Sequence, residues 1–139
     1  MNIAIAIAAL AVSGSAAFSF WKAGYFKATA NRETLLGAGF GWIEPLHTGV
    51  VRLIAWLELL GAVGIVLAPL AAYFVPGFEW ALVVGVAAGI GLALTMVGAA
   101  ILHIVRGEFK YTWKMNISLF GFAAIGATLQ ALVSLPLLG

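Results

Sequence analysis

Two ionisable side chains, Glu58 and His103, stand inside otherwise apolar stretches of this sequence. An ionisable group within a membrane span costs about 3 kcal/mol on insertion scales, so such groups usually face the interior of a bundle and have a partner there. A carboxyl and an imidazole that meet can exchange a proton near neutral pH, where imidazole titrates. We therefore predict Glu58 and His103 as the catalytic residues, with the partner of Glu58 supplied by another helix.

Other polar and aromatic residues fall near this pair and form a predicted ligand-binding set. Lys22 and Asn116 lie at a depth similar to that of the pair, Thr95 shares the helical face of His103, and Gln130 shares the face of Asn116. The set consists of Lys22, Trp56, Thr95, Asn116 and Gln130. Structural roles are the alternative: Lys22 as an interfacial anchor and Asn116 and Gln130 as interhelical hydrogen-bond partners. Two histidines and few carboxylates make a poor metal site, and we predict none.

These residues must be positioned by helices in a membrane. Of the 139 residues, 64% are hydrophobic and only 9% are charged, whereas soluble domains carry roughly 25% charged residues. A bilayer core needs about 20 apolar residues per helix, and four such stretches occur, at residues 2–21, 50–73, 78–105 and 115–138. The fold class is therefore all-α, a single transmembrane four-helix bundle over residues 1–139.

The basic residues predict how this bundle is oriented. All seven lie beside the link between the first and second spans or the link between the third and fourth: Lys22, Lys27, Arg32, Arg52, Arg106, Lys110 and Lys114. The positive-inside rule then places both termini on the non-cytoplasmic side. The cytoplasmic loop 22–49 has a candidate short helix capped by Asn31. A cleaved signal peptide is the less favoured interpretation of the first span, because the basic n-region is missing.

Several classes of function are disfavoured by what the sequence lacks. It contains no cysteine, which removes thiolate metal sites, redox pairs and cysteine nucleophiles. No basic helix or Lys/Arg run suggests nucleic acid. The glycine-rich stretch 37–41 does not follow an apolar strand and is not followed by Gly-Lys-Ser/Thr, so it indicates a hinge and not a nucleotide loop.

Three stretches resemble the DoxX-like family of four-helix integral membrane proteins. The stretch from Arg52 to Pro69, with Glu58, Gly61 and Gly64, is similar to the second helix of that family, and residues 98–106 and 21–24 are similar to the ends of its third and first helices. The family takes its name from a subunit of a thiosulfate:quinone oxidoreductase, and some relatives are linked to oxidative-stress complexes. The resemblance implies a membrane protein with importance at Glu58 and His103, but it supplies no agreed catalytic role.

Three functions remain open from the sequence. The favoured hypothesis is a pocket in the inner leaflet, around Glu58 and His103, that binds a quinone- or isoprenoid-like ligand, as an oxidoreductase-associated subunit or a small membrane enzyme. The alternatives are a small proton-coupled transporter using Glu58 and a noncatalytic assembly subunit. The cofactor is left unassigned, with a quinone from the membrane or from a partner as the candidate. Expected partners are the bilayer, a hydrophobic small molecule, and a membrane protein or a second copy, in a bacterial plasma membrane.

Overall fold

Four long helices dominate the computed structural model, which describes the backbone of residues 2–138 and the side chains of residues 2–134. They are α1 (Ile3–Thr29), α3 (Thr48–Phe74), α4 (Ala81–Val105) and α5 (Phe109–Leu138). Within this part of the chain, these four are the helices long and apolar enough to cross a membrane. The predicted all-α, four-helix fold is confirmed; Met1 and Gly139, the ends of the predicted domain, lie outside the described residues.

Two helices are longer than the apolar stretches suggested. Helix α1 continues to Thr29, past the predicted end at Trp21, and α5 begins at Phe109, before the predicted start at residue 115. Basic and aromatic side chains extend both helices beyond the apolar region, since their long stems can lie along apolar surface while their polar tips reach the interface. The extension of α1 matters for the site, because it carries Lys27 into the bundle.

The first loop contains two short helices, α2 (Arg32–Gly37) and the 3₁₀ helix η1 (Gly41–Ile43). The side chain of Asn31 accepts a hydrogen bond from the backbone N–H of Thr34 at 2.8 Å, so the predicted cap is present. Arg32 donates hydrogen bonds to the carbonyl oxygens of Leu46, Ile43 and Glu44. These bonds fold the loop back over one end of the bundle.

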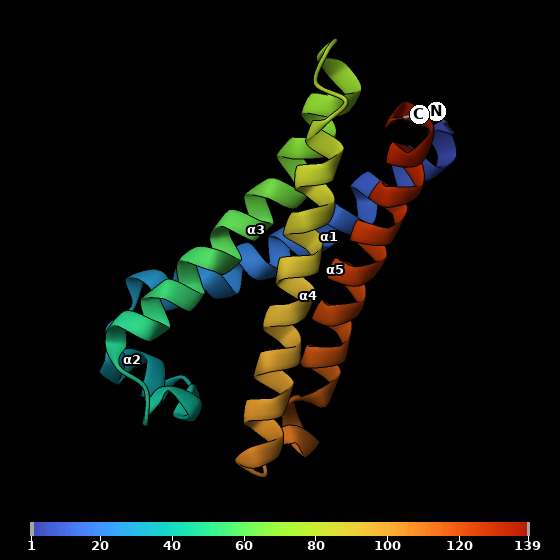
Figure 1. The fold of residues 1–139 in the computed structure, drawn as a ribbon. Coiled ribbons are helices and arrows are strands. Elements are labelled where there is room, and N and C mark those ends of the chain that lie inside the picture. The colour runs from blue at the N-terminus through green and yellow to red at the C-terminus, as the bar shows by residue number, and fades with distance from the viewer. Residues whose placement is uncertain (1, 139) are drawn as a thin grey trace.

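The helices are arranged as a ring. Helix α1 packs on α3 and α5, and α4 also packs on α3 and α5. Figure 1 shows the N- and C-termini together at one end and α2 at the other. We call the end that carries α2, η1 and the α4–α5 turn the basic end, because the seven Lys and Arg residues lie towards it.

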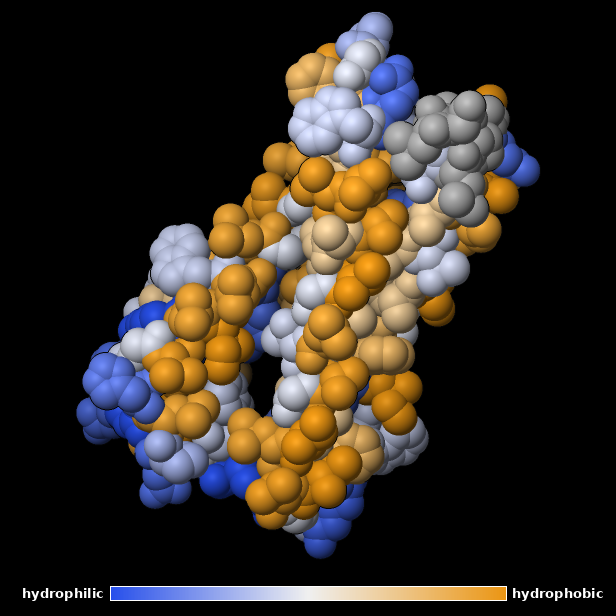
Figure 2. All heavy atoms as spheres, viewed as in Figure 1, coloured by the Kyte–Doolittle hydropathy of each residue, from blue (hydrophilic) through white to orange (hydrophobic). Residues whose placement is uncertain are grey.

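Small and apolar residues at three- and four-residue spacing form the core. Phe20 is fully buried and lies in a cluster with Ala62 of α3, Met96 of α4 and Ala123 of α5. The outer surface is apolar in the middle of the molecule and hydrophilic towards its ends, as Figure 2 shows. Such a distribution is expected for a protein whose middle region lies in the hydrocarbon core of a bilayer.

Candidate functional site

Each spanning helix buries one polar side chain near the basic end: Lys27 on α1, Glu58 on α3, His103 on α4 and Asn116 on α5, all less than 8% exposed. Each lies one or two turns from the core cluster around Phe20, on the basic-end side and on the inward face of its helix. We call these four residues the polar layer. Three of them were predicted as site residues from the sequence, and Lys27 was not.

Glu58 is paired with Lys27. The ammonium nitrogen of Lys27 donates a hydrogen bond to Oε1 of Glu58 at 2.7 Å and lies 2.5 Å from Oε2. Trp42 of η1 covers the ammonium, with 5.9 Å from the nitrogen to the ring centroid. The expectation that the partner comes from another helix is met, but that partner is Lys27 and not His103.

Local packing explains how this pair forms. Gly24 faces α3 so closely that a Cβ there would lie 3.1 Å from the carbonyl oxygen of Ala55 and 3.3 Å from Cβ of Glu58. Small residues allow such close approach of membrane helices. Arg52 then donates hydrogen bonds to the carbonyl oxygens of Lys27 and Ala30 at 2.6 and 2.7 Å, which satisfies the end of α1.

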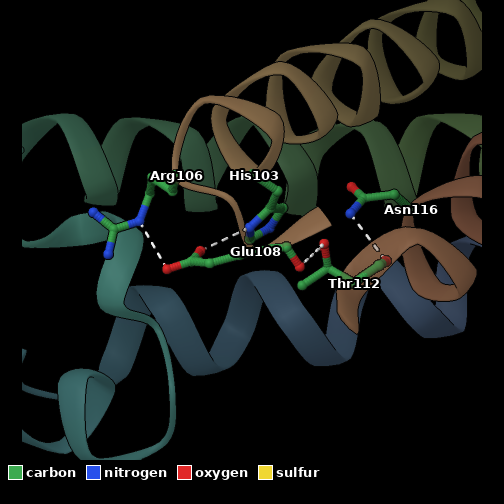
Figure 3. A network of polar contacts seen from close by, with 5 residues as sticks. All are labelled: His103, Arg106, Glu108, Thr112 and Asn116. Carbon is green, nitrogen blue, oxygen red and sulfur yellow. Dashed lines mark hydrogen bonds and ion pairs between the residues drawn. The ribbon is translucent and has the colours of Figure 1, made fainter. Parts of the chain in front are cut away.

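His103 is paired with Glu108, a residue that the sequence reasoning missed. Nδ1 of His103 lies 3.2 Å from Oε2 of Glu108, and Nε of Arg106 donates to Oε1 at 2.9 Å; Figure 3 shows this arrangement. The hydrogen bond with His103, followed by the one from Arg106, holds the pKa of Glu108 below its ordinary value. The carboxylate can only accept, so Nδ1 carries the proton and Nε2 of a neutral His103 is an acceptor.

The end of α4 brings these two side chains together. The backbone N–H of Glu108 bonds to the carbonyl oxygen of His103 at 2.8 Å, and that of Gly107 bonds to the carbonyl oxygen of Ile104 at 3.0 Å. This is a Schellman termination, and Gly107 takes the left-handed conformation that it requires, with φ of 70°. The sequence did contain a signal for this contact. Gly107 directly follows Arg106 at the end of the third span, and a glycine in that position is typical of a helix termination that turns the next residue, Glu108, back towards the helix.

Asn116 completes the layer with an unsatisfied atom. Its Nδ2 donates to the carbonyl oxygen of Thr112 at 3.1 Å, whereas its buried Oδ1 has no hydrogen-bond partner among the described residues. A buried acceptor without a donor costs about 1–3 kcal/mol. Oε1 of Gln130 and the hydroxyl of Tyr73 are likewise buried without a partner among the described residues, but of these three atoms only Oδ1 of Asn116 belongs to the polar layer.

The other predicted ligand-binding residues lie elsewhere. Lys22 is exposed, on a different face of α1 from Lys27, and Trp56 is 58% exposed on the outside of α3. The hydroxyl of Thr95 donates to the carbonyl oxygen of Gly91 within its own helix at 2.9 Å. The structure therefore does not bring these three into the polar layer.

Gln130 is fully buried in the middle of the bundle, away from the polar layer. Its Nε2 donates to Oγ of Ser13 and to the carbonyl oxygen of Ile65, both at 2.8 Å. Pro69 stands four residues after Ile65 and has no N–H to donate within the helix. Gln130 therefore supplies the hydrogen bond that the proline removes, and it joins α5 to α1 and α3.

A large apolar groove lies outside the polar layer. It has a volume of about 300 Å³ and runs between residues 86–94 of α4 and 120–131 of α5. Ile90, Leu94 and Phe120 in its lining are exposed on the molecular surface. The groove is suited to contact with lipid and has no charged group in its lining. Among the residues that the structure describes, no cluster of three or more His, Asp or Glu residues could hold a metal.

The fold and its buried polar residues define a multi-pass integral membrane protein with four spanning helices. The model of the DoxX-like family matches residues 11–127. The chain belongs to this family, and the matched region includes all four residues of the polar layer. No curated protein matches the chain, and no solved structure matches it.

Proposed function

We propose that this protein binds a lipid-soluble ligand with a polar head group, quinone- or isoprenoid-like, at the polar layer. His103 and Asn116 would contact the head group, and the Lys27–Glu58 pair would hold α1 and α3 in place behind them. The observation that carries the proposal is Oδ1 of Asn116, which is buried and has no donor among the described residues. Pockets for small molecules are mostly apolar and contain a few such convergent polar groups.

The packing of α3 against α4 supports a route from the membrane to this layer. A Cβ at Gly61 would lie 2.7 Å from the side chain of Leu92, and one at Gly64 would lie 3.0 Å from Cβ of Ala88, so the two helices touch there. Towards the basic end they diverge, as Figure 1 shows, and Figure 2 shows a hollow between them. We propose that the ligand enters through this hollow from the cytoplasmic leaflet, the side that the positive charges predict.

The chemistry available at the layer is proton transfer. A neutral His103 with its proton on Nδ1 presents Nε2 as a base, and Glu108 stabilises the imidazolium that forms when Nε2 takes a proton. Glu58 stays in the proposal as the partner of Lys27 and not as a free carboxylate. This pairing counts against the transporter alternative, which needs Glu58 to load and release a proton alone.

Ligand analysis of the purified protein tests the proposal. The wild-type protein would be extracted in native-lipid nanodiscs, and the apolar lipids would be quantified by mass spectrometry. We expect one isoprenoid or quinone class to be enriched over the bulk membrane. Asn116→Leu should reduce this enrichment by about fivefold, the value of one hydrogen bond, whereas the lipid-facing variant Trp56→Phe should retain it. Bulk phospholipid alone in all three samples would contradict the proposal.

The Lys27–Glu58 pair favours a second candidate function, that of a noncatalytic assembly subunit. The pair joins α1 to α3 and is sealed from solvent, as expected for a group that keeps helices together. In that case Glu58→Gln should lower the stability of the bundle or the yield of a membrane partner in pull-down experiments, and no ligand should be enriched in the wild type. Enrichment that survives in a correctly folded Glu58→Gln variant would argue for the ligand proposal instead.

A further inference from the structure

We infer that the head group bound at the polar layer is a hydroxyl, as in a prenol, a phenol or a hydroquinone, and not a carbonyl or an ether. The inference rests on the proposed function and specifies the class of ligand. It follows from the character of the two groups that would meet the ligand, Oδ1 of Asn116 and Nε2 of His103, because both are hydrogen-bond acceptors.

The orientation of the Asn116 amide is determined by its neighbour. The group next to the amide is the backbone carbonyl oxygen of Thr112, 3.1 Å from Nδ2. A carbonyl oxygen cannot donate, so the NH₂ group must be the one that faces Thr112. The amide oxygen is thereby directed to the other side, where it is buried with no described donor. Asn116 therefore offers an acceptor to a ligand.

The tautomer of His103 is determined in the same way. Glu108 is a carboxylate held by Arg106, and its Oε2 lies 3.2 Å from Nδ1 of His103. The proton of a neutral imidazole therefore stays on Nδ1, and Nε2 keeps its lone pair. The two ring nitrogens point in roughly opposite directions, so Nε2 is directed away from the α4–α5 turn. No hydrogen bond from a described residue reaches it. Glu108 is thus a positioning residue for this acceptor.

The two acceptors share one side of the α4–α5 hairpin. Glu108, Thr112 and Asn116 follow one another at four-residue spacing, so they lie on one face of the chain that leads into α5, and His103 contacts the first of them. Figure 3 shows Glu108, Thr112 and Asn116 in succession, with His103 of α4 beside Glu108. Along the helix axes His103 and Asn116 differ in depth by about 6 Å, roughly one helical turn, so a single hydroxyl, which has one hydrogen to donate, bonds to one of the two acceptors at a time.

Charge selects among the ligands that could donate. An ammonium head group also donates hydrogen bonds, but the basic end carries seven Lys and Arg residues against four glutamates, a net charge of +3 (7 − 4) that disfavours a cation. A carbonyl or ether oxygen would place its lone pairs against those of Oδ1 and Nε2. The head group must therefore donate a hydrogen bond and carry no positive charge, and a neutral hydroxyl does both.

A matched pair of ligands tests the inference. The protein in nanodiscs would be titrated with farnesol and with farnesyl methyl ether, which share the chain but differ in the hydroxyl hydrogen. We expect farnesol to bind about fivefold more tightly than the ether, the effect of one hydrogen bond. Asn116→Leu should bring the two affinities to within about twofold, and Trp56→Phe should leave the wild-type ratio unchanged.

Glu108→Gln provides a second variant with a readout that a merely structural role would not change. The amide of the introduced glutamine can donate to Nδ1, so the imidazole proton is no longer restricted to Nδ1. The ¹⁵N chemical shifts of His103 report which ring nitrogen carries the proton. The wild type should show the proton on Nδ1, and the variant should show a mixture of tautomers and a smaller preference for farnesol. Equal binding of alcohol and ether by the wild type would overturn this inference and leave ligand binding intact. Binding of neither probe would overturn the proposed function as well.

Discussion

Lys27 and Glu58 carry opposite charges and are both buried inside the bundle. Both side chains are less than 8% exposed, and the ammonium lies within 2.7 Å of the carboxylate. Burial of two charges is expensive, and their attraction offsets this cost only when the geometry is close. Removal of one partner leaves an uncompensated charge, whereas removal of both does not. The stability of the bundle should therefore depend on the two residues together.

A double-mutant cycle measures this dependence. Lys27→Met should lower the free energy of unfolding by about 3 kcal/mol, because it strands the carboxylate of Glu58. Lys27→Met combined with Glu58→Gln should recover part of that loss, since the charge is gone from both sites. Unfolding in detergent, followed by circular dichroism, gives the free energies of unfolding of the wild type, Lys27→Met, Glu58→Gln and the double variant, the four corners of the cycle. Additive losses in the double variant would show that the two side chains do not interact.

Pro69 interrupts the backbone hydrogen bonding of α3. The carbonyl oxygen of Ile65 cannot bond to residue 69, so it takes a hydrogen bond from Gln130 of α5 at 2.8 Å. The amide oxygen of Gln130 in turn approaches α4 so closely that a Cβ at Gly85 would lie 2.1 Å from it. One side chain thus contacts all three other spanning helices at the level of the proline.

The coupling between Pro69 and Gln130 can be measured directly. Gln130→Met should destabilise the wild-type protein by about 1 kcal/mol, the typical value for an interhelical hydrogen bond in a membrane. In a Pro69→Ala background the same change should cost less, because the introduced alanine supplies the backbone N–H that the carbonyl oxygen of Ile65 lacks. Equal costs in both backgrounds, measured by unfolding in detergent, would mean that Gln130 does not substitute for the missing helical bond.

Close packing of α4 on α5 depends on Gly89. A Cβ there would lie 2.8 Å from Cβ of Ala127 and 3.1 Å from the carbonyl oxygen of Ala123, whereas a Cβ at Gly91 would meet nothing within 4 Å. We expect Gly89→Ala to destabilise the bundle by about 1–3 kcal/mol through overpacking. Gly91→Ala, in the same helix, should be neutral or slightly stabilising. Similar thermal stability of the two variants would contradict this account of the interface.

Across the whole molecule, positive charge is confined to one end and both termini lie at the other. The positive-inside rule then predicts that the polar layer lies towards the cytoplasm. Since the chain has no cysteine, a single introduced cysteine can be labelled with a maleimide without labelling elsewhere in the chain, and its accessibility reports the orientation. Glu79→Cys should react with a membrane-impermeant maleimide in intact cells, and Lys110→Cys should react only after permeabilisation. The reverse pattern would invert the topology and move the proposed entry route to the outer leaflet.

The sequence predicted the four helices well because each is a long apolar run, which has few alternatives in a membrane. It also indicated Glu58, His103 and Asn116, since polar residues stand out against such runs. Lys27 was not predicted as a site residue, because the apolar run that indicates the first span stops at Trp21 and Lys27 lies beyond it. The inward spacing of Phe20, Gly24 and Lys27 shows that the helix continues.

Pairing between polar residues was harder to predict than their burial. Spacing along one helix gives the face of a residue but not its neighbour on another helix, so the sequence alone cannot tell whether His103 meets Glu58. The true partner of His103 is Glu108, reached through the tight turn at Gly107. That contact depends on backbone geometry after the helix end, which the hydrophobic pattern does not encode.

Photolabelling tests most directly whether the polar layer binds the ligand. A farnesol analogue with a photoreactive diazirine next to the hydroxyl would be crosslinked to the wild-type protein in nanodiscs, and the labelled peptides would be mapped by mass spectrometry. We predict labels near His103 on α4 and near Asn116 on α5, and their loss when excess farnesol competes. Labels confined to the apolar groove around Ile90 and Phe120, or to the surface near Trp56, with no competition by farnesol, would contradict the account.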